Sequence, residues 1–169
     1  MILTGKEIEK QVKKGRITIV PFLKTSINPN SYNYHIGKTI LEVSENIINP
    51  NKKTKAKKIV IDEKGFLLKP KKLYLGHTLE KIGSEDYVIS LIGRSSIGRL
   101  GLFLQITADL GQIGNAHCWT LELTVIQPLW IYPGMKIGQI SFWKPLGKKS
   151  LKYYGYYSKY SNPQRCKLL

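Results

Sequence analysis

The chain has 169 residues, a length that suits one domain over residues 1–169 with a core that needs no staples. Its two cysteines, Cys118 and Cys166, form no CxxC pair, and this spacing excludes a disulfide framework and a zinc site. The 27 basic and 11 acidic residues give a formal net charge of +16, which attracts polyanions such as nucleotide triphosphates or nucleic acid.

The N-terminal segment indicates the compartment. Residues 1–7 contain no basic stretch followed by an apolar run, so they do not resemble a signal peptide. No stretch reaches the roughly 18 apolar residues that a membrane span requires. We therefore expect a cytoplasmic protein with free thiols and no membrane partner.

The first predicted element is a short amphipathic helix. Thr4 and Glu7 have the spacing of a capping box, in which the hydroxyl and the carboxylate each accept a backbone N–H of the first turn. Ile8 and Val12 follow one turn apart on one face. Gly15 is a suitable C-cap, so the helix is predicted to end near residue 14.

Short β-rich runs separated by turns make up the rest of the chain, up to an irregular basic tail from residue 144. Residues 62–65 predict a hairpin turn between two runs, because glycine at position 65 can adopt a positive φ. Pro133-Gly134 predicts a second turn. This pattern indicates a mainly β fold, either a sandwich or a distorted barrel. The predicted strands span residues 16–22, 39–43, 58–61, 66–68, 73–75, 87–92, 102–107, 118–126 and 135–143.

Lysine runs occur in the loop predicted at residues 46–57 and in two later segments. A charge run is usually a solvated face. The sequence has no helix-turn-helix, RNP or zinc-finger motif. Nucleic acid is therefore not the expected partner, although the charge leaves it open.

A cluster of hydrogen-bond donors follows the strand that ends at Gly93. Arg94, Ser95, Ser96 and Arg99 fall within six residues. Each guanidinium can bind phosphate oxygens two at a time, and the hydroxyls add further donors. Ser95 and Arg99 would share a face on one helical turn. The alternative interpretation is a surface turn with two ordinary arginines.

The strand predicted at residues 118–126 carries a single charge. Alternate residues of a strand share a face, so Leu121 and Leu123 lie on an apolar face and Thr120 and Glu122 on the opposite one. Burial would raise the pKa of the Glu122 carboxyl toward the range that suits proton transfer. A solvent-facing glutamate or a structural salt bridge is an equally good interpretation of the strand pattern alone.

Residues 93–102, Gly-Arg-Ser-Ser-Ile-Gly-Arg-Leu-Gly-Leu, resemble the signature of dCTP deaminases, which share a fold with trimeric dUTPases. The resemblance continues through residues 27–37, 107–108, 120–122 and 132–140. It implies a distorted, dUTPase-like β-barrel of the β-clip type that forms a homotrimer with sites between subunits. It also implies hydrolysis of the 4-amino group of dCTP to give dUTP and ammonia, with Mg²⁺ bound to the triphosphate.

The resemblance also implies roles for individual residues. Glu122 would activate the water, and Ser95 and Arg99 would stabilise the tetrahedral centre at C4. Arg94 and Ser96 would hold phosphates. The remaining predicted substrate contacts are Ala108 beside the water, Thr120 and Leu121 at the base, Gln112 at the sugar, and Tyr153, Lys159 and Gln164 in a tail that closes over the nucleotide.

No protein-held metal is expected, because the sequence lacks the H-x-E and P-C-x-x-C motifs of zinc nucleobase deaminases. Its histidines, His35, His77 and His117, are scattered. Deamination by this chain would therefore be zinc-independent.

The sequence departs from the family pattern at four places. Gln112 replaces an Asp that contacts the sugar, and Gln cannot act as a base. Asn33 replaces an Asp, His117 replaces a Gly, and Pro163 replaces a Gln, with Gln164 one place later. Because the matching Asp takes part in pyrophosphate release in dUTPases, we expect deamination without that second step.

Two alternatives to a dCTP deaminase remain. The chain could be a dUTP pyrophosphatase or a bifunctional deaminase and pyrophosphatase, against which Gln112 counts. It could instead be a catalytically altered nucleotide-binding protein whose charge of +16 serves a nucleic-acid partner.

Overall fold

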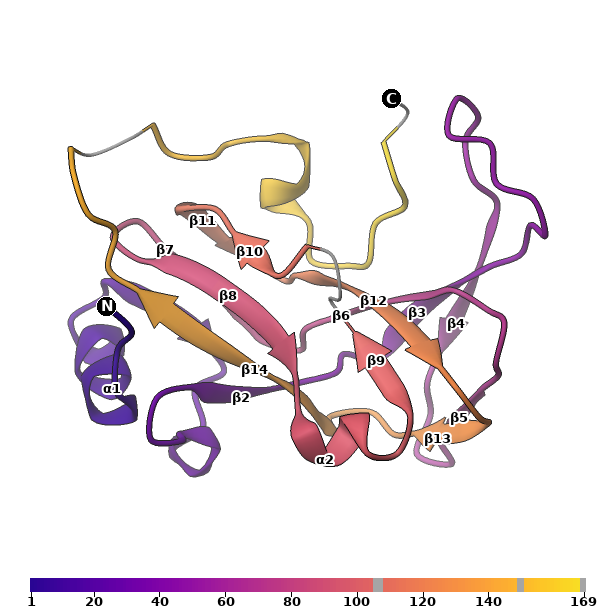
Figure 1. Cartoon of the computed structure of the whole chain (residues 1–169), viewed down its shortest axis with the longest axis horizontal. Coiled ribbons are helices and arrows are strands. Elements are labelled where there is room, and N and C mark those ends of the chain that lie inside the picture. Colours follow the sequence, from indigo (N-terminus) through magenta and orange to yellow (C-terminus); the bar gives the residue numbers. More distant parts are fainter. Residues whose placement is uncertain (105–107, 149–150, 168–169) are drawn as a thin grey trace.

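A computed structural model describes residues 1–104, 108–148 and 151–167 (Figure 1). Its mainly β architecture with a short N-terminal helix confirms the predicted fold class. The elements are α1 (Gly5–Lys13), β1 (Ile17–Val20), η1 (Lys24–Ser26), β2 (Tyr32–His35), β3 (Thr39–Val43), β4 (Ala56–Val60), β5 (Phe66–Leu68), β6 (Tyr74–His77), β7 (Lys81–Ser84), β8 (Val88–Gly93), α2 (Ser95–Gly98), β9 (Leu102–Leu104), β10 (Leu110–Gly111), β11 (Gly114–His117), β12 (Thr120–Val125), β13 (Leu129–Ile131), β14 (Lys136–Trp143) and η2 (Tyr156–Lys159).

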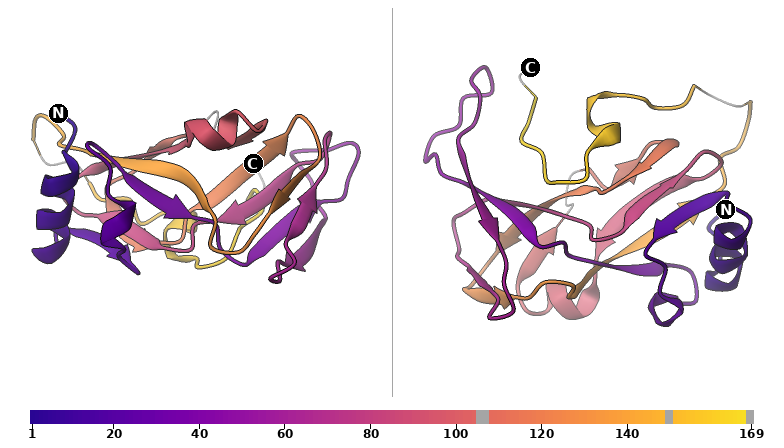
Figure 2. Two further views of the ribbon diagram at one scale, coloured as in Figure 1. Left: turned by 90° about the horizontal axis from the view of Figure 1, so that it is seen from below. Right: turned by 180° about the vertical axis from the view of Figure 1, so that it is seen from behind.

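The strands form antiparallel sheets that wrap around one core as a distorted barrel (Figure 2). A four-stranded sheet has the order β10-β8-β14-β2, and a five-stranded sheet has the order β4-β3-β6-β12-β9. Smaller sheets, β1-β7-β11 and β13-β5, complete the wall. Fully buried aromatic and aliphatic side chains fill the interior, among them Tyr34, Tyr74 and Phe142. The five-stranded sheet is the one that carries Glu122.

Helix α1 begins and ends where the sequence predicts. The Thr4 hydroxyl accepts the Glu7 N–H at 3.4 Å, and Gly15 has a φ of +70° after the last turn. The Glu7 carboxylate does not reach back to the cap as a capping box requires. It accepts a hydrogen bond from the Gln11 side chain instead. The helix buries Ile8 completely against the barrel.

The predicted hairpin around residues 62–65 is wrong, although its turn is present. Gly65 has a φ of +84°, and its N–H donates to Asp62 O at 3.0 Å. The strands on either side do not pair with each other, because β4 pairs with β3 and β5 pairs with β13. A local turn motif fixes the chain reversal, whereas the partner of each strand depends on contacts made far away in the sequence.

Five of the strands, β2, β7, β10, β11 and β13, were not predicted from the sequence. All four residues of β2 are buried, so it lacks the alternation that marks a strand. The two residues of β10 and the sequence Gly-Asn-Ala-His of β11 have low β propensity. These strands exist because their neighbours supply backbone partners.

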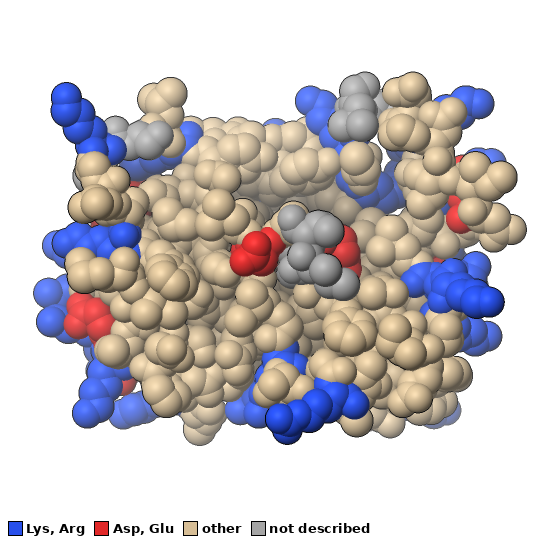
Figure 3. Space-filling model, in the orientation of Figure 1, with Lys and Arg blue, Asp and Glu red and all other residues tan. Residues whose placement is uncertain are grey.

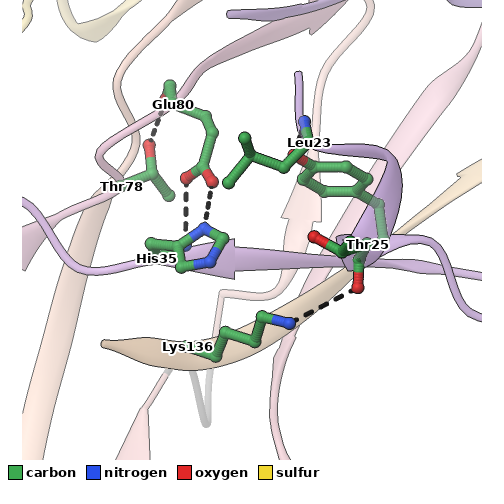
Figure 4. Close-up of polar contacts among 7 residues, drawn as sticks. Leu23, Thr25, His35, Thr78, Glu80 and Lys136 are labelled. Atoms are coloured by element: carbon green, nitrogen blue, oxygen red, sulfur yellow. Dashed lines mark hydrogen bonds and ion pairs between the residues drawn. The ribbon is translucent and has the colours of Figure 1, made fainter. Parts of the chain in front are cut away.

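A buried polar network joins β2 to the connection between β6 and β7 (Figure 4). The completely buried Glu80 accepts the backbone N–H of His35 at 2.9 Å and forms an ion pair with the His35 ring. Thr78 donates to Glu80 O at 2.8 Å and accepts the Trp119 N–H at 2.9 Å. A buried carboxylate is stable only when it has such partners. The bond from Trp119 to Thr78 connects the network to the residue just before β12.

Candidate functional site

A cavity of about 550 Å³ lies beside β12, between the β3–β4 loop, the β10–β11 segment and the C-terminal tail. Figure 1 shows the tail crossing over this side of the barrel above β10, β11 and β12. The predicted site residues that line the cavity are Ala108, Gln112, Thr120, Glu122, Tyr153 and Gln164. Sequence positions up to 56 residues apart therefore meet in one concave site.

Glu122 is placed in the cavity by the alternation of β12. Leu121 and Leu123 are completely buried on the core side, while Glu122 is half-buried and lines the cavity. Burial raises the pKa of the Glu122 carboxyl above its usual value. This environment argues against the fully solvent-facing glutamate that the strand pattern left open. A carboxylate with a raised pKa is suited to accept a proton from water.

Gln112 lies between two glycines, Gly111 and Gly114, whose lack of a side chain allows the cavity wall to pack closely. A Cβ atom at Gly111 would lie 2.6 Å from the ring of Trp119, and one at Gly114 would lie 2.4 Å from Tyr153 O. Any side chain at these positions would push the wall apart. The β10–β11 segment is therefore built to pack tightly between Trp119 and the tail.

The tail is attached to the cavity wall by backbone hydrogen bonds. Tyr153 N–H donates to Ile113 O at 2.8 Å, and Gln164 N–H donates to the Thr120 hydroxyl at 3.1 Å. Tyr153 and Gln164, two of the predicted tail contacts, therefore lie in the cavity wall. Lys159, the third predicted tail residue, is exposed at the end of η2 and does not line the cavity.

The donor cluster forms the predicted helical turn but lies elsewhere. Arg94 precedes α2 as its N-cap residue, and Ser95, Ser96 and Arg99 are exposed. None of these four residues lines the cavity that contains Glu122. A single chain therefore does not bring the donor cluster to Glu122, and the expected site between subunits stays a prediction. Strand β8 carries the cluster in the four-stranded sheet, whereas β12 belongs to the five-stranded one.

Two further predicted positions are Leu121 and Thr107. The Leu121 side chain points into the core, so only its backbone can face a ligand. Thr107, part of the motif at residues 107–108, lies outside the described residues.

Sequence reasoning gave no role to several residues that line the cavity. The His117 ring packs on Trp119 with centroids 4.3 Å apart, and its Nδ1 is 3.0 Å from Asn115 O. Burial lowers the pKa of His117 below its usual value. Arg165 also lines the cavity, and its guanidinium donates to Thr54 O at 2.7 Å. The only signal for His117 was its departure from the family glycine.

Over the described ranges 1–104, 108–148 and 151–167, no cluster of three or more His, Cys, Asp or Glu side chains could hold a metal ion. Within those ranges no helix is long and apolar enough to span a membrane. Cys118 and Cys166 both line the cavity as free thiols. On the face shown in Figure 3, basic side chains lie mainly at the margins, and the centre is mostly uncharged apart from a few acidic side chains.

Known proteins similar to this chain agree on one family. A family model described as dCTP deaminase-like matches residues 2–145. A "dCTP deaminase, dUMP-forming" of Hathewaya histolytica is 49% identical over 84% of this chain and 82% of its own length. A protein of the same name from Clostridium acetobutylicum is 44% identical over 96% of this chain and 88% of its own length.

A solved structure supports the fold. The 2'-deoxycytidine 5'-triphosphate deaminase from Agrobacterium tumefaciens superimposes with a TM-score of 0.67 at 20% identity. The match covers 83% of this chain and 47% of that one, so this chain spans about half its length. With the family model and the two relatives, these findings show that the chain belongs to the dCTP deaminase-like family.

Proposed function

We propose that this protein hydrolyses dCTP to dUMP, with release of ammonia and pyrophosphate. The observation that carries the proposal is Glu122, a half-buried carboxyl group of raised pKa in a cavity lined by predicted nucleotide contacts. Both relatives are named dUMP-forming. Those names support dUMP as the final product, against the expectation from the sequence that dCTP is converted only to dUTP.

Deamination at C4 follows from the chemistry of the cavity. Glu122 takes a proton from the water as its oxygen attacks C4, and it passes this proton to the ring nitrogen N3. The second proton then moves from the new hydroxyl group through Glu122 to the amino group, which leaves as ammonia as the C4 carbonyl forms. The Ala108 backbone and the Thr120 backbone lie in the same wall, where they can position the water and the pyrimidine. A preorganised, partly dry site makes such transfers efficient because little solvent has to reorganise.

A homotrimer would supply the donors that one chain does not bring to this cavity. The donor cluster lies on and beside α2, outside the cavity that contains Glu122, where a neighbouring chain could contact it. Its members are Arg94, Ser95, Ser96 and Arg99. Exposed apolar side chains lie close to α2 in the sequence, including Ile92 on β8 and Phe103 on β9. Both strands lie on the side of the molecule that Figure 3 shows. We infer that this face contacts other copies and completes the site.

Magnesium would enter as part of the substrate, bound to the triphosphate of dCTP. Arg94 and Arg99 could bind the phosphate oxygens that Mg²⁺ does not neutralise, through charge-assisted hydrogen bonds. We further propose that deamination proceeds without zinc, and that the protein acts in the cytoplasm, where its free thiols stay reduced.

A product time course tests this function. The purified protein is incubated with dCTP and Mg²⁺, and ammonia, dUTP, dUMP and pyrophosphate are each quantified. We expect one dUMP, one pyrophosphate and one ammonia for each dCTP consumed, with little free dUTP. The activity should survive a zinc-selective chelator that spares Mg²⁺. Absence of ammonia release from dCTP would contradict the proposal.

A further inference from the structure

Formation of dUMP from dCTP requires two hydrolyses at opposite ends of the nucleotide. One water attacks C4 of the base, and a second attacks the α-phosphorus. Glu122 serves the first reaction in the proposed function. Gln112, which stands where the family has an aspartate, has an amide that cannot take a proton at neutral pH. The second water therefore needs another proton acceptor.

His117 is the described side chain of the cavity with the right chemistry. It lies at the end of β11, and the cavity wall includes it together with Gln112. Its Nδ1 faces Asn115 O at 3.0 Å, a carbonyl that can only accept, so the hydrogen must be on Nδ1. That tautomer leaves a lone pair on Nε2. Among the described residues, nothing forms a hydrogen bond with Nε2.

The surroundings keep the imidazole neutral and fixed. Burial is the main cause that lowers the pKa of His117, and the positive charge of Lys81 on β7 lowers it further, while the bond to Asn115 opposes both. Stacking on Trp119 at 4.3 Å fixes the ring plane, and the Trp119 indole is itself anchored to Ile82 O at 3.0 Å. Other titratable groups of the cavity wall are Cys118, Glu122, Tyr153, Tyr157, Arg165 and Cys166.

We propose that His117 is the general base for pyrophosphate release, an inference that rests on the proposed function. Nε2 removes a proton from the second water as its oxygen bonds to the α-phosphorus. The bond between that phosphorus and the oxygen bridging to the β-phosphorus breaks, and its electron pair leaves with pyrophosphate. The proton then passes from the imidazolium to solvent. His117 replaces in function the carboxylate that Gln112 lacks.

The test is product partition in a His117→Gln variant. A glutamine amide can still donate to Asn115 O but accepts no proton. We expect the ratio of pyrophosphate release to ammonia release to fall about 100-fold, so that dUTP accumulates. Unchanged dUMP formation by this variant would overturn the role of His117 while leaving the proposed function intact. Absence of ammonia release in the unchanged protein would instead remove the proposed function.

Chemical rescue separates a base from a structural side chain. The His117→Gly variant has the family residue and opens space beside Trp119. In this variant, added imidazole should raise the rate of pyrophosphate release by at least about tenfold. His77→Gln is the matched control, because His77 is a buried histidine of lowered pKa that bonds Thr78 O and does not line the cavity. Equal loss of pyrophosphate release in the His77 variant, or no rescue by imidazole, would overturn the proposal.

The pH profile gives a third readout. Neutral His117 is the active form, so pyrophosphate release should rise with pH through the pKa of His117 and level off above it. Because that pKa lies below the usual value, the plateau should begin on the acid side of neutrality. In His117→Gln this acid limb should disappear from pyrophosphate release. Persistence of the same limb in the variant would assign it to another group.

Discussion

The β12 cavity and the α2 turn carry the two halves of the proposed chemistry, and they differ in how they are built. The cavity collects residues from the β10–β11 segment, β12 and the tail, and close contacts at Gly111 and Gly114 hold it together. The α2 turn with its two flanking arginines, residues 94–99, is one continuous run in which Ser95, Ser96 and Arg99 are exposed. One half is complete within a single chain, and the other is presented outward. Under the proposed function, the α2 donors of a neighbouring copy would complete the cavity.

The strongest test of the cavity half is Glu122→Gln. Loss of the proton acceptor should lower ammonia release by about 1,000-fold, because general-base catalysis contributes on this scale. Binding of dCTP, measured by calorimetry, should change little. Glu42→Gln is the control, since Glu42 lies in the same sheet but pairs with Lys72. Near-normal ammonia release by the Glu122 variant would remove the assigned base.

The outward-facing half is tested by Arg99→Ala, which should lower kcat/KM for dCTP by about 100-fold through loss of charge-assisted hydrogen bonds. Mixing this variant with Glu122→Gln after partial denaturation and refolding should restore activity. With sites between adjacent subunits, about a quarter of the sites in a 1:1 mixture would contain both intact groups. Arg16→Ala, which alters an exposed arginine outside the cluster, is the control.

Failure of the mixture to regain activity would contradict sites between subunits. If each site is formed within one chain, the mixture stays as inactive as its parts. That outcome would end the contrast between the two regions and require a rearrangement that brings α2 to β12.

A smaller effect is expected where the cavity meets the tail. In Gly114→Ala the added Cβ would lie 2.4 Å from Tyr153 O and displace the tail at Tyr153. We expect KM for dCTP to rise about tenfold, because each displaced contact of this kind costs about 1–3 kcal/mol. Trypsin should also cleave faster after Lys159, which mass spectrometry can follow. An unchanged cleavage rate would show that the tail does not depend on this contact.

The smallest effect is expected on the lysine-rich loop. Replacing Lys52, Lys53 and Lys55 together with Gln removes three charges from exposed positions between β3 and β4. Surface substitutions of this type change stability little, so dCTP turnover should stay within about twofold. Binding to a DNA duplex should be weak and salt-dependent in both proteins. Tight duplex binding that the variant loses would favour the alternative of a nucleic-acid partner.

Local patterns predicted the parts of the fold that depend on near neighbours. The cap at Thr4, the alternation of β12 and the turns at Gly65 and Gly134 are present as predicted. Strands such as β2 and β11 were missed because their stability comes from distant partners. The false hairpin at residues 62–65 has the same cause.

The sequence alone determined the mainly β class, the face on which Glu122 lies and the donor set of residues 94–99, because side-chain chemistry and strand periodicity are local properties. Only the tertiary structure decided what surrounds each group. It brought His117, Trp119 and Arg165 into the cavity and separated α2 from Glu122. Such proximity depends on which strands pair across the barrel, and pairing is set by packing between residues far apart in the chain.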